Sequence, residues 1–329
     1  MKMRILSAQD VRRALPMAEA IEGMKQAFAQ LSTGQAVVPL RGRVDVASQD
    51  GTTLVMPAFL AQSNDLAVKV VSIFPKNNAR GEPTIYAAVL VLDAETGRPL
   101  ALMEGGTLTA IRTGAGSGAA TDLLARPNAS VVAILGSGVQ ARTQLEAVCT
   151  VRNIEEVRVY SPTHENAVTF AREMRGVGPV PDTIRIMSNA ETAVRNAEII
   201  CTATTSNQPV FNGKDVATGT HINGVGSYTP AMQEVDAETV QRALVVVDER
   251  EAAWEEAGDL IQPLQAGLIT QDHIHAELGE IVAGLKPGRT DPQQITFFKS
   301  VGNAAQDAIS GRIALANAIA HNLGTEANL

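Results

Sequence analysis

Two sets of residues in this sequence have types and spacing that could support chemistry. The first is the run Gly136-Ser-Gly138-Val-Gln-Ala141, which follows an apolar stretch and precedes a segment with helical spacing. Glycines at these positions permit a tight turn and the close approach of a pyrophosphate, and a small residue at the last position lets helix and strand pack closely. The N-terminus of the helix adds free N–H groups and a partial positive charge. The pattern therefore predicts a dinucleotide site.

The second set consists of basic side chains in surroundings that disfavour charge. Lys69 lies in an apolar run, Arg112 lies in a helical segment rich in alanine and glycine, and Arg41 opens a strand-like segment. Charged residues are rarely buried without a partner. One ammonium and two guanidinium groups suit a small carboxylate, because bidentate arginine contacts fix its plane. The alternative is that Lys69 faces solvent on an edge strand and that the arginines pair with acids of the chain: Asp45, Glu104 or Asp122.

The elements around these residues predict an α/β fold with two domains. The segment 131–135 is typical of a buried parallel strand, 140–151 of a helix and 156–160 of a second strand, and this alternation continues to residue 247. It predicts a Rossmann-type, doubly wound parallel sheet. Five strand-like runs between residues 37 and 104 predict a largely antiparallel sheet in a separate α+β domain. Residues 260–285 are expected to be peripheral and helical, and 304–322 to form a long amphipathic helix.

Composition narrows the class of protein. With 329 residues, of which 45% are apolar, the chain can form two domains. The net charge of −8 argues against nucleic acid and against an anionic membrane as main partners. The two cysteines, Cys149 and Cys201, lie in apolar segments and are expected to be reduced, which favours a cytoplasmic location. No segment approaches the roughly 20 apolar residues that span a bilayer. No metal site is expected.

Four motifs together resemble the ornithine cyclodeaminase/μ-crystallin family: Lys69-Val-Val-Ser-Ile-Phe-Pro-Lys-Asn, Leu108-Thr-Ala-Ile-Arg-Thr-Gly-Ala, Gly136-Ser-Gly-Val-Gln-Ala and Phe298-Lys-Ser-Val-Gly-Asn-Ala. The resemblance runs over nearly the whole chain. It implies a substrate-binding and dimerisation domain at 1–119, to which the C-terminal segment 304–329 returns. It implies an NAD(P)-binding Rossmann domain at 120–303, and a homodimer.

The resemblance also implies roles for single residues. Arg41, Lys69 and Arg112 would hold a substrate carboxylate beside the nicotinamide, with Arg43 as the alternative to Arg41. Lys69 is the candidate catalytic acid, although a purely electrostatic role is equally consistent with the sequence. Ser227 and Thr229 are candidates for hydrogen bonds to substrate. Asp307 could orient the final helix or contact substrate.

The expected cofactor contacts extend beyond the fingerprint. A strand that selects NAD usually ends in Asp or Glu. Here it is followed by the hydroxyls of Ser161 and Thr163, and Arg142 is close in sequence to the turn, so NADP is predicted, with NAD possible. The complete set of predicted cofactor residues is Arg112, Thr113, Gly136, Ser137, Gly138, Val139, Gln140, Ala141, Ser161, Thr163, Thr202, Ala203, Thr204, Val225, Ser300 and Gly302.

The resemblance leaves three functions open. Cyclodeaminases carry an aspartate base in a Gly-x-Asp-x-Pro turn, and we expect Ser227 at that position here. Because an unassisted serine is a poor base, the residues favour an NAD(P)H-dependent reductase of a small α-imino acid, reversible as an amino-acid dehydrogenase. Candidate substrates are a cyclic imine such as pyrroline-2-carboxylate, another ketimine, or the imine of a 2-oxo acid. The alternatives are ornithine cyclodeamination to proline and ammonia, and a non-catalytic, crystallin-like binding protein.

Overall fold

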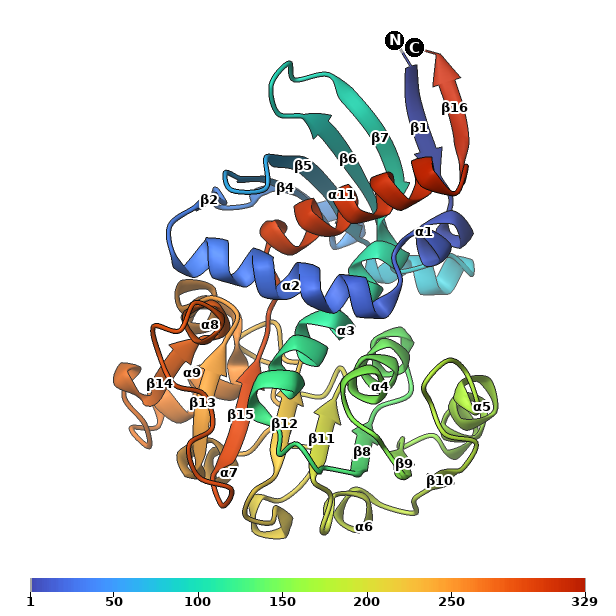
Figure 1. Cartoon of the computed structure of the whole chain (residues 1–329). Coiled ribbons are helices and arrows are strands. Elements are labelled where there is room, and N and C mark those ends of the chain that lie inside the picture. Colours follow the sequence, from blue (N-terminus) through green and yellow to red (C-terminus); the bar gives the residue numbers. More distant parts are fainter. Residues whose placement is uncertain (1, 329) are drawn as a thin grey trace. The chain divides into compact units, whose positions relative to one another are not determined.

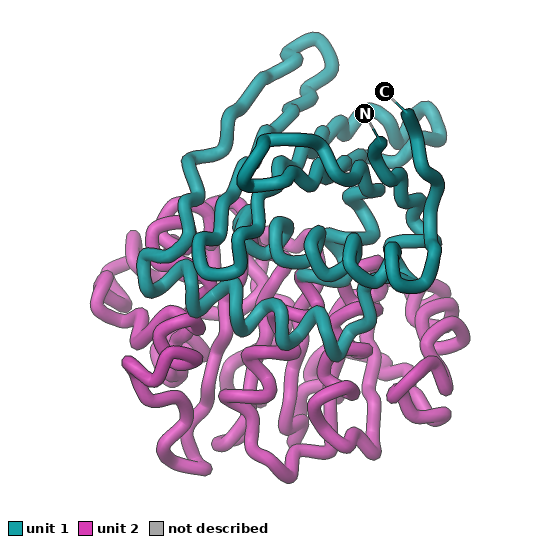
Figure 2. Tube along the Cα trace, turned by 45° about the horizontal axis from the view of Figure 1, so that its top comes forward, with its two compact units in different colours: residues 1–112, 303–329 teal, residues 113–302 magenta. Residues whose placement is uncertain are grey.

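The computed structural model of the chain describes residues 2–328. It divides into two compact units (Figure 2): unit 1 is Met1–Arg112 with Asn303–Leu329, and unit 2 is Thr113–Gly302. The division falls inside helix α3 (Gly105–Leu124), which also contains the boundary expected from the sequence at 119/120.

Unit 1 is built on one sheet of eight strands within the described residues (Figure 1): β1 (Lys2–Leu6), β2 (Ala36–Val37), β3 (Gly42–Val46), β4 (Gly51–Leu60), β5 (Asp65–Ile73), β6 (Ile85–Asp93), β7 (Pro99–Glu104) and β16 (Thr325–Asn328). The strand order is β16-β1-β7-β6-β5-β4-β2, and β3 pairs with β4. All neighbours are antiparallel except β1 and β7, which are parallel. The largely antiparallel sheet predicted from the sequence is therefore present.

Helices cover one face of this sheet. Helices α1 (Ala8–Ala14) and α2 (Met17–Ser32) follow β1, and the C-terminal helix α11 (Ala304–Ala320) contacts α2, β4, β5 and β6. Strand residues alternate between the two faces, and on β5 the buried positions are Asp65, Ala67 and Lys69. Lys69 thus lies on the helix-covered face by register. The alternative of a solvent-facing lysine on an edge strand is wrong, because β5 lies between β4 and β6.

Unit 2 contains a parallel sheet of eight strands among the described residues: β8 (Val131–Leu135), β9 (Glu156–Tyr160), β10 (Ile184–Ile186), β11 (Ile199–Thr202), β12 (His221–Gly224), β13 (Ala243–Val247), β14 (Ile274–Glu277) and β15 (Ile295–Lys299). Their order is β10-β9-β8-β11-β12-β15-β13-β14, and every pair is parallel. The chain reverses its direction of winding between β8 and β11, which is the switch point where open α/β sheets bind ligands. The predicted fold class is confirmed.

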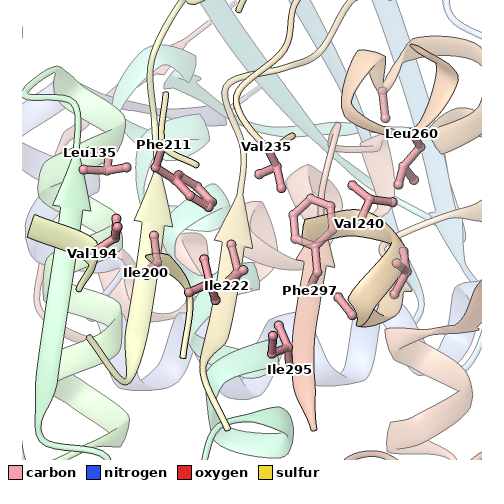
Figure 3. Close-up of a cluster of buried hydrophobic side chains, with 14 of the residues drawn as sticks. Leu135, Val194, Ile200, Phe211, Ile222, Val235, Val240, Leu260, Ile295 and Phe297 are labelled. Atoms are coloured by element: carbon pink, nitrogen blue, oxygen red, sulfur yellow. The ribbon is translucent and has the colours of Figure 1, made fainter. Parts of the chain in front are cut away.

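Helices pack on both faces of the parallel sheet: α3, α4 (Val139–Val151), α5 (His164–Met174), α6 (Ala190–Val194), α7 (Ala237–Arg242), α8 (Arg250–Glu256), α9 (Gly258–Gln265) and α10 (Leu278–Val282). The residues of β8 alternate between two apolar cores, with Val132 and Ile134 in one and Ala133 and Leu135 in the other. Figure 3 shows the second core, where Leu135, Ile200, Ile222 and Phe297 extend from the successive strands β8, β11, β12 and β15. Burial on both faces explains why these strands are continuous apolar runs.

One expectation about unit 2 is wrong in part, although α9 and α10 are helices within or overlapping the segment concerned. The sequence predicts peripheral helical structure for residues 260–285, but this segment includes strand β14, which pairs with β13 as the last strand of the sheet. Leu260, at the start of the segment, is fully buried. The strand has only four residues and lies between short helices, so no periodic pattern in the sequence is long enough to reveal it.

No helix in residues 2–328 has the length and apolar character needed to cross a membrane. Cys149 and Cys201 are both free and buried, and burial raises the pKa of each thiol to about 12.

Candidate functional site

The phosphate turn of unit 2 begins directly after β8. Gly136 has φ +114°, and a Cβ atom there would lie 2.4 Å from the carbonyl oxygen of Ala203. A side chain at this position would therefore be strained and would collide with the loop after β11. Gly136 is required by the turn itself, at the switch point between β8 and β11.

Gly138 has a different environment. It is the N-cap of α4 and has extended backbone angles, and a Cβ atom added to it would have no other atom within 4 Å. Val139, the next residue, is exposed, whereas Ala141 is fully buried against the sheet. The helix N-terminus therefore faces open space bounded by backbone N–H groups. A pyrophosphate fits this cradle, and Gly138, Val139 and Gln140 are the residues that would hold it.

Arg142 stabilises the turn through contacts within the protein. Its Nη1 donates to the carbonyl oxygens of Ser137 (2.5 Å) and Gly138 (3.0 Å), and its Nε donates to Glu173 (3.0 Å). The guanidinium also lies over the ring of Phe170, 5.5 Å from its centre. The hydrogen bond from Arg142 lowers the pKa of Glu173. The suggestion that Arg142 supports a 2′-phosphate is weakened by these contacts.

The ribose end of the predicted site has hydroxyl groups and no carboxylate directly after β9. The Ser137 hydroxyl donates to the Ser161 hydroxyl (3.1 Å), which links the turn to the end of β9. Thr163 is exposed and precedes α5. Ser161 and Thr163 remain predicted contacts of the ribose end.

A buried glutamate, Glu234, joins the loops that follow β11 and β12. Its carboxylate accepts from the Thr202 hydroxyl (2.9 Å), the Thr204 amide (2.6 Å) and the Gly226 amide (2.7 Å). These loops contain the predicted cofactor residues Thr202, Ala203, Thr204 and Val225. Glu234 lies in an irregular segment with no periodic signal, and it is not among the residues that the sequence predicts.

Two more charged groups surround Glu234. Asp259 accepts from the amides of Glu234 (2.7 Å) and Val235 (2.9 Å), and it forms an ion pair with Lys299 (3.3 Å), which also donates to the Gly224 carbonyl (3.3 Å). All three side chains are fully buried. Burial and the carboxylate of Asp259 raise the pKa of Glu234, and Lys299 opposes this shift. The cluster fixes the backbone at the ends of three strands.

The loop after β15 has a similar anchor. Asp248 follows β13 and accepts from the Ser300 hydroxyl (2.7 Å), the Val301 amide (3.0 Å) and the Gly302 amide (2.7 Å). Burial raises the pKa of this carboxyl. Asp248 therefore holds the backbone of the loop that contains the predicted cofactor residues Ser300 and Gly302. It is an acid directly after an apolar strand, and this position could have been recognised in the sequence.

We expect Glu234→Gln to destabilise unit 2 and to disturb the strand-end loops. A glutamine would turn an amide N–H₂ toward N–H or O–H donors and leave a buried donor unsatisfied, which costs about 1–3 kcal/mol of unfolding free energy. Denaturant unfolding monitored by circular dichroism measures this change. The exposed Glu255→Gln is the matched control and should change the unfolding free energy by less than about 0.5 kcal/mol. Equal stability of both variants would contradict the assigned role of Glu234.

The turn after β12 differs from the expectation for Ser227. Its hydroxyl donates to the Met232 carbonyl (2.9 Å) and accepts from the Asp259 amide (3.2 Å), and the residue is fully buried. These contacts hold the loop in place. Thr229, the other residue predicted to contact substrate, is exposed. Counting from Gly226 to Pro230 also places Tyr228, and not Ser227, at the third position of the turn. Neither side chain is a carboxylate.

His221 at the start of β12 is part of the core of unit 2. Its Nδ1 lies 2.9 Å from the Thr296 hydroxyl, and its Nε2 lies 3.1 Å from Asn223 Oδ1. Burial, together with the charge of Arg289, lowers the pKa of His221 to about 3. The imidazole is therefore neutral at physiological pH, and its contacts to Thr296 and Asn223 are those of a residue that stabilises the core.

The basic cluster of unit 1 is formed by Lys69 on β5 and Arg112 on α3, which are 3% and 5% exposed. Both contact Asp307 on α11: Lys69 Nζ lies 2.5 Å from Oδ2, and Arg112 Nε lies 3.1 Å from Oδ1. Arg112 Nη1 also donates to Gln306 Oε1 (2.6 Å). The expected pairing of Arg112 with Asp45, Glu104 or Asp122 is wrong. Its partner is Asp307, which is 195 residues away in the chain.

Arg41 and Arg43 have different environments. Arg41 is half-buried before β3, and its charge lowers the pKa of Lys69. Arg43 is exposed and pairs with Asp45 (2.9 Å). Arg41 is therefore the residue that acts electrostatically on the cluster.

The environment of Lys69 shifts the pKa of its ammonium group. Burial lowers the pKa of its ammonium to about 8; the carboxylate of Asp307 opposes the shift, and the charges of Arg112 and Arg41 add to it. The ammonium form is still the major one at neutral pH. Lys69 is thus a buried cation that can lose a proton near physiological pH.

The structure brings the predicted residues together in two groups. Lys69 and Arg112 form the basic cluster of unit 1, on which the charge of Arg41 acts. The fingerprint, Thr202–Thr204, Val225, Ser300 and Gly302 lie at the C-terminal ends of β8, β11, β12 and β15 in unit 2. Thr113 also belongs to unit 2, where its carbonyl accepts from Gln144 (3.4 Å).

Comparison with known proteins identifies the family of the chain. The profile of the ornithine cyclodeaminase/mu-crystallin family matches residues 1–322. A Delta(1)-pyrroline-2-carboxylate reductase of Bacillus cereus is 40% identical over 323 residues, which are 98% of each chain. The structure of the Thermococcus litoralis Delta(1)-pyrroline-2-carboxylate reductase in complex with NADH and L-proline is 46% identical, with a TM-score of 0.93 over 99% of this chain and 100% of that one. An archaeal alanine dehydrogenase dimer with bound NAD is 35% identical, with a TM-score of 0.91 over the full length of both chains. The chain belongs to the ornithine cyclodeaminase/mu-crystallin family.

Proposed function

We propose that the protein is an NAD(P)H-dependent reductase of small α-imino acids, which also oxidises the corresponding amino acid in the reverse direction. Δ1-pyrroline-2-carboxylate is the first substrate to test. The observation that carries the proposal is the buried basic cluster of unit 1, in a chain whose other unit has a phosphate turn that fits a dinucleotide. Unit 1 would bind the substrate and unit 2 the cofactor.

The charges of the cluster favour a small anion. Lys69 and Arg112 carry two positive charges, and Asp307 supplies one negative charge. A substrate carboxylate would reduce the remaining positive charge, and its binding is favoured because the cations are already desolvated. Within the protein, Nε of Arg112 donates to Asp307 and Nη1 of Arg112 donates to Gln306. We assign Nη2 of Arg112 and Nζ of Lys69 to the substrate carboxylate.

The residues of the site provide the proton in this reaction. The bound nicotinamide supplies the hydride that reduces the C=N carbon. The imine nitrogen requires a proton when it enters in the neutral form, and Nζ of Lys69 can donate it because its pKa of about 8 lies near neutral pH. Fixing the carboxylate would orient the adjacent C=N bond toward one face.

The choice between NADP and NAD is part of the proposal. The absence of a carboxylate directly after β9 favours NADP, since no acid there accepts from the ribose 2′-OH. The contacts of Arg142 remove one cation that could bind the 2′-phosphate, and two similar structures contain NAD or NADH. We therefore expect both cofactors to be used, and comparing KM for NADPH with KM for NADH measures the preference.

True cyclodeamination is not supported by the turn after β12. Its base would be a carboxylate, whereas the residues here are Ser227 and Tyr228, and Ser227 is committed to the loop. A neutral phenol, like a serine hydroxyl, is a poor general base without an activating partner.

The test of the function is a substrate panel. Oxidation of NADPH and NADH, followed by the absorbance of the reduced nicotinamide, is measured with Δ1-pyrroline-2-carboxylate, with pyruvate plus ammonia or methylamine, and with a dicarboxylic 2-oxo acid plus ammonia. Ornithine is assayed in parallel for release of ammonia. We expect turnover with the cyclic imine and formation of one proline per cofactor oxidised. No turnover with any imine would refute the proposal, and ammonia from ornithine would favour the cyclodeaminase.

We also propose a homodimer formed through the open face of the unit 1 sheet. This face is opposite to the one that α11 covers, and it carries apolar side chains at paired positions, Val55 with Val70 and Val68 with Leu90. Val55, Val70 and Tyr86 are 38%, 40% and 51% exposed. A continuous apolar patch of this kind marks an interaction surface, and a dimer with twofold symmetry would cover it with its own copy.

We expect Val55→Glu to weaken this dimer strongly, because it places an unpaired charge in an apolar interface. The sedimentation equilibrium of the variant should shift toward the monomer at micromolar concentration. Val168→Glu on α5, an exposed valine of unit 2, is the control and should leave the association unchanged. If both variants associate as the unaltered protein does, the interface lies elsewhere.

A further inference from the structure

We propose that Asp307 is a positioning residue for the reaction: its carboxylate holds Lys69 and Arg112 in place and keeps Lys69 in the ammonium form. The inference rests on the proposed function, in which these two cations bind the substrate carboxylate. It assigns to the C-terminal helix α11 a role in the chemistry of the site.

The geometry divides the two oxygens of Asp307 between the two cations. Oδ2 lies 2.5 Å from Lys69 Nζ, and Oδ1 lies 3.1 Å from Arg112 Nε. The side chain of Asp307 is 2% exposed, so both pairs are shielded from water. One carboxylate therefore fixes the position of the ammonium relative to the guanidinium. A bidentate substrate carboxylate requires this spacing to be constant.

Gln306 fixes the second contact of the guanidinium. Its Oε1 accepts from Arg112 Nη1 (2.6 Å) and from the Asn303 amide (3.0 Å). Because Asn303 is the N-cap of α11, the orientation of Arg112 is tied to the beginning of this helix. Residues 306 and 307 act as adjacent supports on one turn.

Asp307 is the anion that acts on Lys69 among the described residues. The cross-strand neighbours of Lys69 are Met56 on β4 and Val89 on β6, which are apolar. The charged groups that act on it are Asp307 from α11, Arg112 from α3 and Arg41 from the segment before β3. Burial and the two arginines favour the neutral amine, so Asp307 is the group that favours the ammonium.

The sign of the expected change follows from this balance. Removal of the carboxylate takes away an interaction that raises the pKa of Lys69, and the pKa must therefore fall below its value of about 8. The neutral amine would then be present at neutral pH, and it neither attracts a carboxylate nor donates a proton as an ammonium does. Carboxylate binding would weaken near neutral pH and recover as the pH is lowered through the new pKa.

The direct test is the titration of Lys69 itself, which does not depend on catalysis. The chain has seven lysines that can be labelled with [ε-13C]lysine, and Lys69→Met identifies the Lys69 resonance. We expect Lys69 to titrate near pH 8 in the unaltered protein and at least about one unit lower in Asp307→Asn. Ser310→Ala, a buried position one turn further along α11 whose hydroxyl has no partner in residues 2–328, is the control and should leave the titration unchanged.

Asp307→Glu provides the conservative variant. It keeps the negative charge, so Lys69 should titrate within about half a unit of its original value. If Asp307→Asn does not fold, Asp307→Glu and the unaltered protein still test the claim. A Lys69 pKa near the ordinary lysine value of about 10.4 in both of these proteins would overturn the proposal. An unchanged Lys69 titration in a folded Asp307→Asn would overturn it as well.

Binding of L-proline in the presence of NAD+ gives the functional readout. Calorimetry between about pH 5.5 and 9 should show that the affinity of Asp307→Asn is at least about tenfold lower near neutral pH and that it recovers toward the acidic end, as the pKa shift requires. A pH-independent loss would mean a purely structural role and would overturn the proposal. If the unaltered protein reduces no imine, the proposed function fails, whereas the Lys69 titration still decides the role of Asp307.

Discussion

Replacing Lys69 with methionine should lower kcat/KM for imine reduction by about 10²–10³-fold, the range for loss of a group that stabilises charge or transfers a proton. Methionine retains the apolar stem of the lysine but removes the charge that would bind the substrate carboxylate. The substitution also leaves Asp307 paired with Arg112 alone. Steady-state kinetics with Δ1-pyrroline-2-carboxylate measures the effect.

Two companion variants separate the causes of this loss. Lys69→Arg keeps a positive charge but holds its proton too tightly to act as an acid, so kcat should fall more than KM rises. Lys76→Met, at a half-exposed lysine that pairs with Asp50 (2.9 Å), should leave both constants within about twofold, as is usual for a surface substitution away from the site. If Lys69→Met kept full activity, the basic cluster could not be the substrate site.

Replacing Gly138 with leucine should reduce NADH and NADPH affinity by about 100-fold or more, since the backbone approach of the pyrophosphate would be blocked, while leaving the protein folded. A Cβ at this position has no neighbour within 4 Å, so the side chain enters the space proposed for the pyrophosphate and not the protein interior. Fluorescence titration of the reduced cofactor gives the affinity, and thermal unfolding gives the stability.

Gly136→Ala is the contrasting variant. Its Cβ would lie 2.4 Å from the Ala203 carbonyl oxygen at a backbone φ of +114°, so we expect a lower melting temperature as well as weaker cofactor binding. The two glycines are two residues apart in the same motif. Substitution of Gly138 should mainly weaken cofactor binding, whereas substitution of Gly136 should also lower the stability of the fold. Unchanged cofactor affinity in Gly138→Leu would contradict the placement of the pyrophosphate.

The sequence revealed the fold wherever a long or regular pattern was present. The strand, glycine turn and helix from Val131 to Val151 form a local unit, and their spacing alone predicts a dinucleotide fold. The run around Lys69 predicted burial, because apolar residues surround the charge. Short elements were lost: β14 has four residues, and local patterns of this length do not distinguish strand from helix.

The cations of the candidate site could be predicted from the sequence, but the pairing of Asp307 with them could not. Asp307 is on α11 and Lys69 is on β5, and only the tertiary packing of α11 against the sheet brings them together. Glu234 acts through its hydrogen bonds to three groups on two loops, which no spacing in the chain encodes. Glu234 lies in an irregular segment, so its residue type alone does not distinguish it from a surface acid in the sequence, whereas Asp248 directly follows an apolar strand.

The most direct test of the central claim is a crystal structure of the protein with NAD+ and L-proline. We expect the proline carboxylate to lie within hydrogen-bonding distance of Lys69 Nζ and Arg112 Nη2, with the pyrophosphate at the amides of Gly138 to Gln140. A proline carboxylate bound away from both cations would contradict the claim that the basic cluster of unit 1 is the substrate site.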